Sequence, residues 1–469
     1  MASKKQPLIS VKWYLFTDFL AIIVASFCGY FYIESSEIHS FFYSPFGWWK
    51  IGFFVMGFLG SFWLIGNYQL GLYHKSRLNE LTDTLWVTLI YLLLWVLIIR
   101  LGTSTYGMGY FTLLYCKFCT LFFIVIGFFR FALLIYIKNQ LYNSSVYFAT
   151  LIIGNNADAV KAYQSVYKNY HYTGWKIIGF VSADNEPKNG LHKHIPYLGS
   201  MQQLNAIIKK ESIEQIIIAL DKSQRDQIDA IVRQYSNSLL SIKMIPSTLD
   251  ILAGAVKTNN VFGATLIDIK IVRLSHFQQN IKRIIDILTA TVGLVLLSPF
   301  LLLAAFITAL CNKGTIIYKQ ERIGYRNKPF TIYKFISMYP NAEANGPLLS
   351  SENDARVTPL GKFFRKWRID ELPQLWNIIK GDMSLVGPRP ERPFYINQIV
   401  QKAPHYQYLL SVKPGLSSWG MVQFGYASSV EEMIERMQYD LMYVENASIL
   451  LDLKIMLHTL RIILMGQGK

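Results

Sequence analysis

The chain has 469 residues, enough for several domains. Hydrophobic residues make up 52% of it, aromatic residues 15% and charged residues only 16%, which is typical of a membrane protein. The formal net charge of +16 favours contact with anionic lipid and phosphate-bearing substrates, and the absence of any RNA- or DNA-binding motif argues against a nucleic-acid partner.

Four apolar segments open the chain, and each has about the length of a membrane-spanning helix. They cover residues 13–33, 46–66, 85–101 and 111–137. Basic residues precede the first segment, lie in the 67–84 loop and follow the fourth, so the positive-inside rule places both ends of a four-helix transmembrane bundle in the cytoplasm. Arg130, inside the fourth segment, is expected to snorkel towards the cytoplasmic surface.

The four cysteines lie in or beside apolar segments, so no disulfide framework is predicted. Cys116 and Cys119 have a metal-like spacing, but no second pair accompanies them, and a membrane-embedded position is the favoured interpretation.

Residues 146–245 alternate between short apolar runs and helical patterns, which predicts a Rossmann-like α/β domain with a parallel sheet. Strands are expected at 147–153, 176–181, 215–220 and 240–245, and helices up to about 169, at 200–210 and at 224–237. The first turn keeps only Gly154 of the dinucleotide fingerprint, so NAD binding is not predicted. A regulatory nucleotide site and a structural or dimerising module stay open. Residues 246–279 form a connector that includes a strand within 261–272.

The next apolar run, Ile284–Leu310, contains Ser298-Pro299 near its middle. Proline removes a backbone hydrogen bond and kinks a helix, and a serine hydroxyl can satisfy the carbonyl that is freed. One interpretation is a kinked fifth spanning helix. Because basic residues flank both ends of the run, we instead predict a re-entrant helix over residues 281–310, with both ends on the cytoplasmic side.

Basic and aromatic residues alternate in the segment 316–334, which predicts a β-hairpin or an extended interfacial segment. Its candidate phosphate contacts are Lys319, Arg322 and Lys334. The polar segment 341–357 is predicted to be a loop that closes over a substrate.

The stretch from Thr358 to Glu391 contains the candidate catalytic carboxylates and further candidate phosphate-binding cations. Thr358-Pro359 predicts a helix start, and Gly381 predicts the end of a second helix that begins at Asp370-Glu371. One interpretation makes Asp370 an N-cap beside a solvated basic face. The other is a phosphate site, in which the helix N-terminus keeps the carboxylate ionised and the cations hold an anion. The candidate cations are Arg365, Arg368 and Arg389, the last of which lies in a turn stiffened by two prolines.

Two amphipathic helices are expected at 431–443 and 447–464, with core or membrane-surface packing.

Several of these segments resemble the bacterial sugar transferases, the monotopic polyprenyl-phosphate hexose-1-phosphate transferases (phosphoglycosyl transferases). The similarity runs from about residue 280 to the C-terminus. It includes KRIIDILTATVGLVLLSPF, IYKQERIGYRNKPFTIYKF, DELPQLWNIIKGDMSLVGPRPE, KPGLSSWG and YDLMYVENASILLDLKIML. The four N-terminal apolar segments and the α/β middle resemble the large subclass of that family.

The resemblance implies that Asp370 is the nucleophile and that Glu371 is a Mg²⁺ ligand. It implies transfer of a sugar 1-phosphate from a UDP-sugar to undecaprenyl phosphate through an aspartyl-phosphosugar, with release of UMP. Such a step would initiate exopolysaccharide, capsule or O-antigen synthesis. The resemblance also implies the bacterial inner membrane, a catalytic domain on its cytoplasmic face, and a homodimer.

The predicted organisation is a multi-domain membrane protein. The bundle covers residues 1–145, the Rossmann-like domain 146–245, the connector 246–279, and a mainly helical α+β catalytic domain 280–469. Ile336 stands where the family usually has a basic residue, which keeps open a catalytically inactive scaffold of a polysaccharide assembly complex. A nucleotide-responsive sensor using the middle domain is the third hypothesis.

Overall fold

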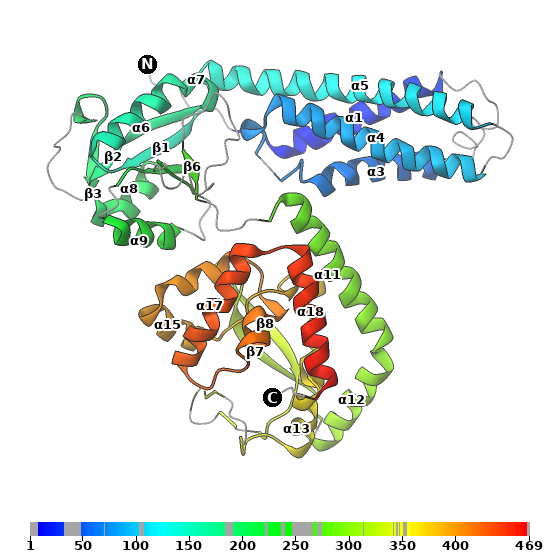
Figure 1. Cartoon of the computed structure of the whole chain (residues 1–469), viewed down its shortest axis with the longest axis vertical. Helices are drawn as coiled ribbons and strands as arrows, with labels where there is room; N and C mark the ends of the chain where they lie inside the picture. Colours follow the sequence, from blue (N-terminus) through cyan, green and yellow to red (C-terminus); the bar gives the residue numbers. More distant parts are fainter. Residues whose placement is uncertain are drawn as a thin grey trace. The chain divides into compact units, whose positions relative to one another are not determined.

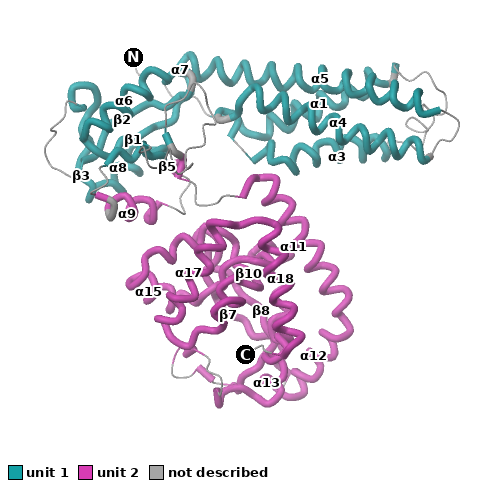
Figure 2. Tube along the Cα trace, viewed as in Figure 1, with its two compact units in different colours: residues 1–220, 243–267 teal, residues 221–242, 268–469 magenta. Residues whose placement is uncertain are grey.

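The structure, a computed structural model, describes most of the chain. The described residues are 8–31, 48–69, 71–102, 107–182, 191–220, 224–235, 240–245, 266–269, 274–312, 314–340, 342–343, 346, 348–349 and 354–466. They form two compact units. One comprises residues 1–220 and 243–267, and the other comprises residues 221–242 and 268–469 (Figure 2).

The N-terminal part of the first unit is a set of apolar helices (Figure 1). They are α1 Val11–Tyr30, α3 Trp48–Ile65, α4 Arg77–Gly102 and α5 Met108–Tyr142. Three of them, α1, α4 and α5, are long and apolar enough to cross a membrane, whereas α3 is shorter. Phenylalanines fill the core between the helices, and large apolar side chains also cover their outer faces. Helices that are apolar on all sides are typical of a membrane protein.

Arg130 does not snorkel, so that prediction is wrong. Its guanidinium is buried and forms a two-point ion pair with Asp18 of α1, with Nε–Oδ1 and Nη2–Oδ2 distances of 2.8 and 2.7 Å. Nη1 donates to Thr84 and lies 3.5 Å from Glu80, both on α4. A carboxylate partner inside the bundle makes burial of this charge tolerable, and the sequence spacing did not show that partner.

A six-stranded sheet follows, in the order β3-β2-β1-β4-β5-β6. Its strands are β1 Phe148–Ile153, β2 Trp175–Ser182, β3 Tyr197–Ser200, β4 Gln215–Ile218, β5 Ser241–Met244 and β6 Ile267–Asp268. The pairs β1–β2, β1–β4 and β2–β3 are parallel, as predicted. The helices of this region are α6 Ala157–Lys168, α7 Tyr170–Thr173, α8 Leu204–Lys210 and α9 Arg225–Tyr235. The strand order is that of a Rossmann-like sheet. Sequence patterns missed β3, which has only four residues.

Gly154 ends β1 with φ +129°. A Cβ there would lie 2.1 Å from the carbonyl oxygen of Ala219, so only glycine fits this turn.

In the second unit the predicted helix break is confirmed. Helices α11 His276–Leu296 and α12 Ser298–Cys311 meet at a 64° bend. Pro299 has no N–H to offer the carbonyl of Val295, four residues earlier, and the hydroxyl of Ser298 donates to that carbonyl at 2.7 Å instead.

The rest of this unit is mainly helical with two small sheets. Strands β7 Ile317–Ile323 and β8 Pro329–Phe335 form an antiparallel hairpin, which confirms the first alternative for this segment, and β9 Ser384–Val386 pairs in parallel with β10 Gly415–Ser417. The helices are α13 Pro359–Lys366, α14 Leu375–Lys380, α15 Pro393–Lys402, α16 Trp419–Gln423, α17 Val430–Asn446 and α18 Ile449–Leu464, with 3₁₀ turns η5 Tyr325–Asn327, η6 Ile369–Gln374 and η7 Pro404–Ser411.

The start of α11 is tied to the core of this unit. Lys282 donates to the carbonyl of Val386 at 2.9 Å, and Asp286 accepts from the N–H of Leu385 at 3.0 Å. These bonds hold β9, the strand that leads directly to Arg389.

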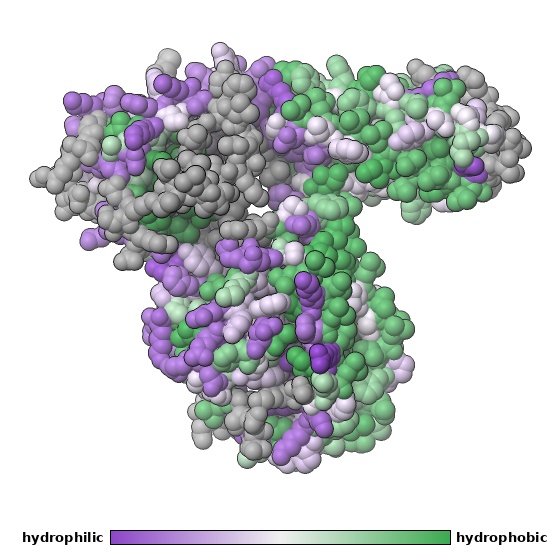
Figure 3. All heavy atoms as spheres, viewed as in Figure 1, coloured by the Kyte–Doolittle hydropathy of each residue, from purple (hydrophilic) through white to green (hydrophobic). Residues whose placement is uncertain are grey.

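Apolar side chains cover the outer faces of α11 and α12 (Figure 3), and α18 also exposes several leucines. The most exposed include Leu288, Val295, Leu296, Leu302, Phe306, Leu310, Leu450, Leu457 and Leu464. Apolar surfaces of this extent mark sites of protein or membrane contact.

Candidate active site

The Asp370-Glu371 pair lies in the first turn of η6, immediately after Arg368. Arg368 adopts a left-handed conformation (φ +53°) and is the residue that caps this turn. The interpretation of Asp370 as the N-cap is therefore wrong. Gly381, with φ +95°, ends α14 as predicted. The left-handed conformation of Arg368 is strained for a non-glycine residue, and such strain is common at functional sites.

Glu371 is buried and surrounded by cations. Its carboxylate oxygens lie 2.7 Å from Lys334 Nζ, 3.4 Å from Arg368 Nη1 and 3.4 Å from Arg389 Nη2. Burial favours the protonated acid, but the three cations outweigh it and hold the pKa of Glu371 well below its usual value. This carboxylate is therefore ionised.

Asp370 is buried to a similar extent but is placed differently. Its side chain lines a cleft, and within the described residues it accepts no hydrogen bond. Burial and the neighbouring Glu371 charge raise the pKa of Asp370, opposed by Lys334, Arg365 and Arg368. The helix N-terminus expected at Asp370 is a short 3₁₀ turn, η6, and burial is the largest influence on the pKa of this carboxyl.

Arg389 reaches the site from the loop after β9. The ring of Tyr426 contacts the guanidiniums of both Arg389 and Arg368, at 5.3 Å each. Sequence analysis missed Tyr426, which belongs to none of the periodic patterns that were recognised. The loop is fixed at Gly387, where a Cβ would lie 2.3 Å from the carbonyl oxygen of Lys413.

Arg365 points to the same cleft from α13. Its Nε donates to Ser337 Oγ at 3.0 Å, and Gly361 packs so closely on Ser337 that a Cβ would lie 2.0 Å from its carbonyl oxygen. Thr358 caps α13 as predicted. Ile336 precedes Ser337 and also lines the cleft.

Successive side chains of a strand point to opposite faces, so only some basic residues of the hairpin lie on the face that lines the cleft. Tyr318 pairs with Lys334, and both line the cleft. Lys319, paired with Tyr333, is exposed and does not line it, so the structure does not bring this candidate to the site. Arg322 does line the cleft.

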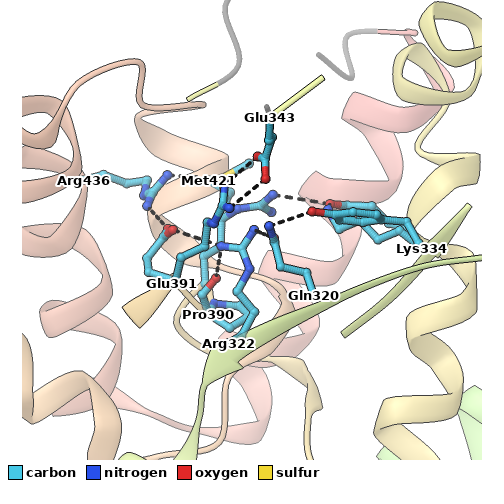
Figure 4. A network of polar contacts seen from close by, with 12 residues as sticks. Gln320, Arg322, Lys334, Glu343, Pro390, Glu391, Met421 and Arg436 are labelled. Carbon is cyan, nitrogen blue, oxygen red and sulfur yellow. Dashed lines mark hydrogen bonds and ion pairs between the residues drawn. The ribbon is translucent and has the colours of Figure 1, made fainter. Parts of the chain in front are cut away.

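The cleft has a volume of about 1120 Å³. Beyond Glu371 it contains a second group of paired charges, shown in Figure 4. Glu391 lies between Arg322 and Arg436, and Arg392 forms a two-point ion pair with Glu343 at 2.6 and 2.8 Å. The predicted loop over residues 341–357 lies partly outside the described residues.

The described residues contain no group of three or more histidine, cysteine, aspartate or glutamate side chains that could hold a metal ion. Asp370 and Glu371 nevertheless supply the hard oxygen atoms that Mg²⁺ prefers, and Mg²⁺ sites commonly use one or two carboxylates together with substrate phosphates. The donor set therefore fits Mg²⁺ when phosphates are present.

Two family models match this chain. The model described as bacterial sugar transferase covers residues 277–466, and the model described as CoA-binding domain covers residues 64–246. These ranges contain the candidate active site and most of the Rossmann-like sheet.

Several relatives are named as undecaprenyl-phosphate sugar phosphotransferases. The UDP-N-acetylgalactosamine-undecaprenyl-phosphate N-acetylgalactosaminephosphotransferase of Aeromonas hydrophila is 43% identical over 40% of this chain and 44% of its own length. A putative undecaprenyl-phosphate N-acetylgalactosaminyl 1-phosphate transferase of Bacillus subtilis is 44% identical over 27% of this chain and 70% of its own length. The UDP-glucose:undecaprenyl-phosphate glucose-1-phosphate transferase of Escherichia coli K12 is 29% identical over 69% of this chain and 68% of its own length.

The chain thus spans less than half of the Aeromonas relative. Among solved structures, a UDP-D-quinovosamine 4-dehydrogenase from Vibrio fischeri matches 27% of this chain and 95% of its own at 17% identity, with a TM-score of 0.21, which supports no conclusion.

Proposed function

The chain belongs to the bacterial sugar transferase family, and on this premise we propose that it transfers a sugar 1-phosphate from a UDP-sugar to undecaprenyl phosphate. The observation that carries the proposal is the contrast between two adjacent buried carboxylates. Glu371 is held ionised by three cations, whereas Asp370 faces the cleft and accepts no hydrogen bond from any described residue. Glu371 can therefore hold cations in place, and Asp370 is available to react with a substrate.

In the first step a carboxylate oxygen of Asp370 attacks the phosphorus that bears the sugar. A P–O bond forms, the bond between the two phosphates breaks, and UMP leaves with that electron pair. In the second step an oxygen of undecaprenyl phosphate attacks the same phosphorus, and the carboxylate of Asp370 leaves. Lys334, Arg365 and Arg389 would offset the phosphate charges that gather during both steps.

Mg²⁺ is proposed as the cofactor, with Glu371 as its main protein ligand. When bound, the ion would neutralise phosphate charge. Because Lys334, Arg368 and Arg389 already compensate Glu371, we expect Mg²⁺ to bind weakly to the free enzyme and more tightly once substrate phosphates contribute ligands.

The bent pair of α11 and α12 is proposed to enter and leave the membrane on one side, as a re-entrant helix. This arrangement keeps the catalytic domain on the cytoplasmic face of the inner membrane, where UDP-sugars are made, and brings the cleft to the lipid-bound acceptor. Undecaprenyl phosphate and the water-soluble donor can then reach Asp370 in turn.

For the donor, UDP-N-acetylgalactosamine is the first candidate. The relatives of 43% and 44% identity carry N-acetylgalactosamine in their names, whereas the glucose transferase of Escherichia coli is 29% identical. The homodimer and the type of polysaccharide remain predictions.

The alternative of an inactive scaffold rests on Ile336, an apolar residue on the cleft wall. The complete set of ion pairs around Glu371 favours the enzyme, because an inactive protein has no need of a buried cluster of four charges.

The decisive experiment is a mass-spectrometric search for a covalent adduct. The purified full chain is incubated with Mg²⁺ and a panel of UDP-sugars, without lipid acceptor. We expect a sugar-phosphate mass on the peptide that contains Asp370, absent in Asp370→Asn and present in Asp382→Asn, an acid outside the cleft. No adduct with any donor, together with no UMP release when undecaprenyl phosphate is added, would refute the proposal.

A further inference from the structure

The cleft offers a diphosphate two groups of cations, and only one of them lies beside Asp370. The second group consists of Arg322 on β7 and Arg436 on α17, both of which line the cleft (Figure 4). Between them Glu391 is 4% exposed, with Oε2 3.3 Å from Arg322 Nη1 and Oε1 2.5 Å from Arg436 Nη2. One carboxylate therefore compensates two guanidiniums.

The guanidinium of Arg322 is held in place by further contacts. Arg322 donates to the carbonyl of Pro390 at 3.1 Å and to Gln320 Oε1 at 2.7 Å, and the N–H of Ile323 donates to the carbonyl of Glu391 at 3.2 Å. Within the described residues, Arg322 Nε has no hydrogen-bond partner. If the acid were absent, two guanidiniums without a carboxylate partner would line the cleft, and guanidiniums bind phosphate oxygens well.

We infer that Glu391 is a specificity-determining residue, which withholds Arg322 and Arg436 from the phosphates of the donor. The phosphates are thereby directed to Lys334, Arg365 and Arg389, next to the reacting carboxylate. This inference rests on the proposed function, since it assumes a donor with two phosphates. Its physical basis is that the two groups of cations have the same chemistry and share one cleft, so they differ in how far an acid compensates them: Glu371 is shared among three cations, whereas Glu391 is shared between two.

The test is Glu391→Gln, which keeps the shape of the side chain and an acceptor oxygen but removes its charge. A donor bound at the freed guanidiniums lies away from Asp370 and is unproductive. We therefore expect kcat and the donor KM to fall together, each about tenfold, with little change in kcat/KM. Calorimetry should show UMP binding about tenfold more tightly. A merely structural role of Glu391 predicts the opposite pattern, in which kcat/KM falls and UMP binds no more tightly.

A compensating variant sharpens the test. In Glu391→Gln/Arg436→Gln one positive charge leaves with the negative one, so kcat, KM and UMP affinity should return to within about threefold of the wild type. If Glu391→Gln does not fold, Glu391→Asp serves instead, because its shorter side chain cannot reach both guanidiniums. It should raise UMP affinity about threefold.

An unchanged or weaker UMP affinity in a folded Glu391 variant overturns the inference. Absence of turnover in the wild type with every donor would instead refute the proposed function, and UMP calorimetry would still report on Glu391. The two failures are thus distinguishable.

Discussion

Replacing Pro299 by alanine should straighten the bent helix pair in the membrane. The alanine N–H can donate to the carbonyl of Val295, which in the wild type accepts from the hydroxyl of Ser298. One continuous helix over residues 276–311 would then be long enough to cross the bilayer. The proposed re-entrant form and the spanning form differ in the side of the membrane on which Cys311 lies.

The structure sets the size of the effect. The apolar part of α11, residues 284–296, and the whole of α12 are each about 20 Å long at 1.5 Å per residue. With the 64° bend shared equally, each axis is tilted about 32° from the membrane plane and reaches a depth of about 11 Å, well short of a hydrocarbon core of about 30 Å. Proline costs about 3 kcal/mol relative to alanine inside a helix, which is a factor of about 150 in the equilibrium between the two forms.

The assay uses Cys311, which is exposed at the end of α12, in a variant whose other three cysteines are replaced by alanine. A membrane-impermeant maleimide is added to intact spheroplasts and, separately, to lysed ones. The wild type should react only after lysis. If about 1% of wild-type chains span the membrane, a 150-fold shift makes about 60% of Pro299→Ala chains reactive from outside. Ser298→Ala, which keeps the proline, is the matched control and should stay protected.

Reaction of wild-type Cys311 in intact spheroplasts would refute the re-entrant arrangement itself. Equal protection of the wild type and Pro299→Ala would show that the bend is fixed by packing of the helices and not by the missing hydrogen bond.

Three further predictions concern buried charges. Burial raises the pKa of Asp440 to about 6 despite the N–H of Gly420, so the free energy of unfolding of the wild type should fall by about 2 kcal/mol as pH rises from 4 to 7. Thermal unfolding of Asp440→Asn should not show this fall across the same pH range. Arg130→Met leaves Asp18 buried without its guanidinium partner and should lower the free energy of unfolding by about 3–5 kcal/mol in denaturant titrations of the full chain. The double variant Asp18→Leu/Arg130→Met should recover most of this loss. Mg²⁺ should bind measurably by calorimetry only when UMP is present, and Glu371→Gln should abolish that binding while UMP still binds.

Each of these has a clear contrary result. Parallel pH profiles for the wild type and Asp440→Asn would mean that this carboxyl does not titrate between pH 4 and 7. A double variant as unstable as Arg130→Met would mean that lost packing, not the unpaired charge, causes the instability. Tight Mg²⁺ binding without UMP would contradict the view that Glu371 is compensated by its cations.

Local signals in the sequence were sufficient for much of the fold. The lengths of the apolar runs predicted α1, α4 and α5, and the alternation of strands and helices predicted the parallel sheet. Ser298-Pro299 predicted the helix break, and Thr358 and Gly381 predicted helix ends. These features succeed because they depend on backbone sterics and on hydrogen bonds between residues a few positions apart.

The sequence by itself therefore determined the order of the segments and identified the Asp370-Glu371 pair, and only the tertiary structure decided how charges meet. Lys334 reaches Glu371 across 37 positions of the chain, and Arg130 reaches Asp18 across 112. Alternation along the hairpin places Lys334 and Lys319 on opposite faces, and tertiary packing decides that the face with Lys334 lines the cleft. Hydrophobic periodicity shows which face of an element is buried. It does not show which residue pairs with a buried charge, because that partner comes from a segment that is distant in the sequence. Pairing is favoured when the segments pack together, because an unpaired charge in the interior costs more free energy.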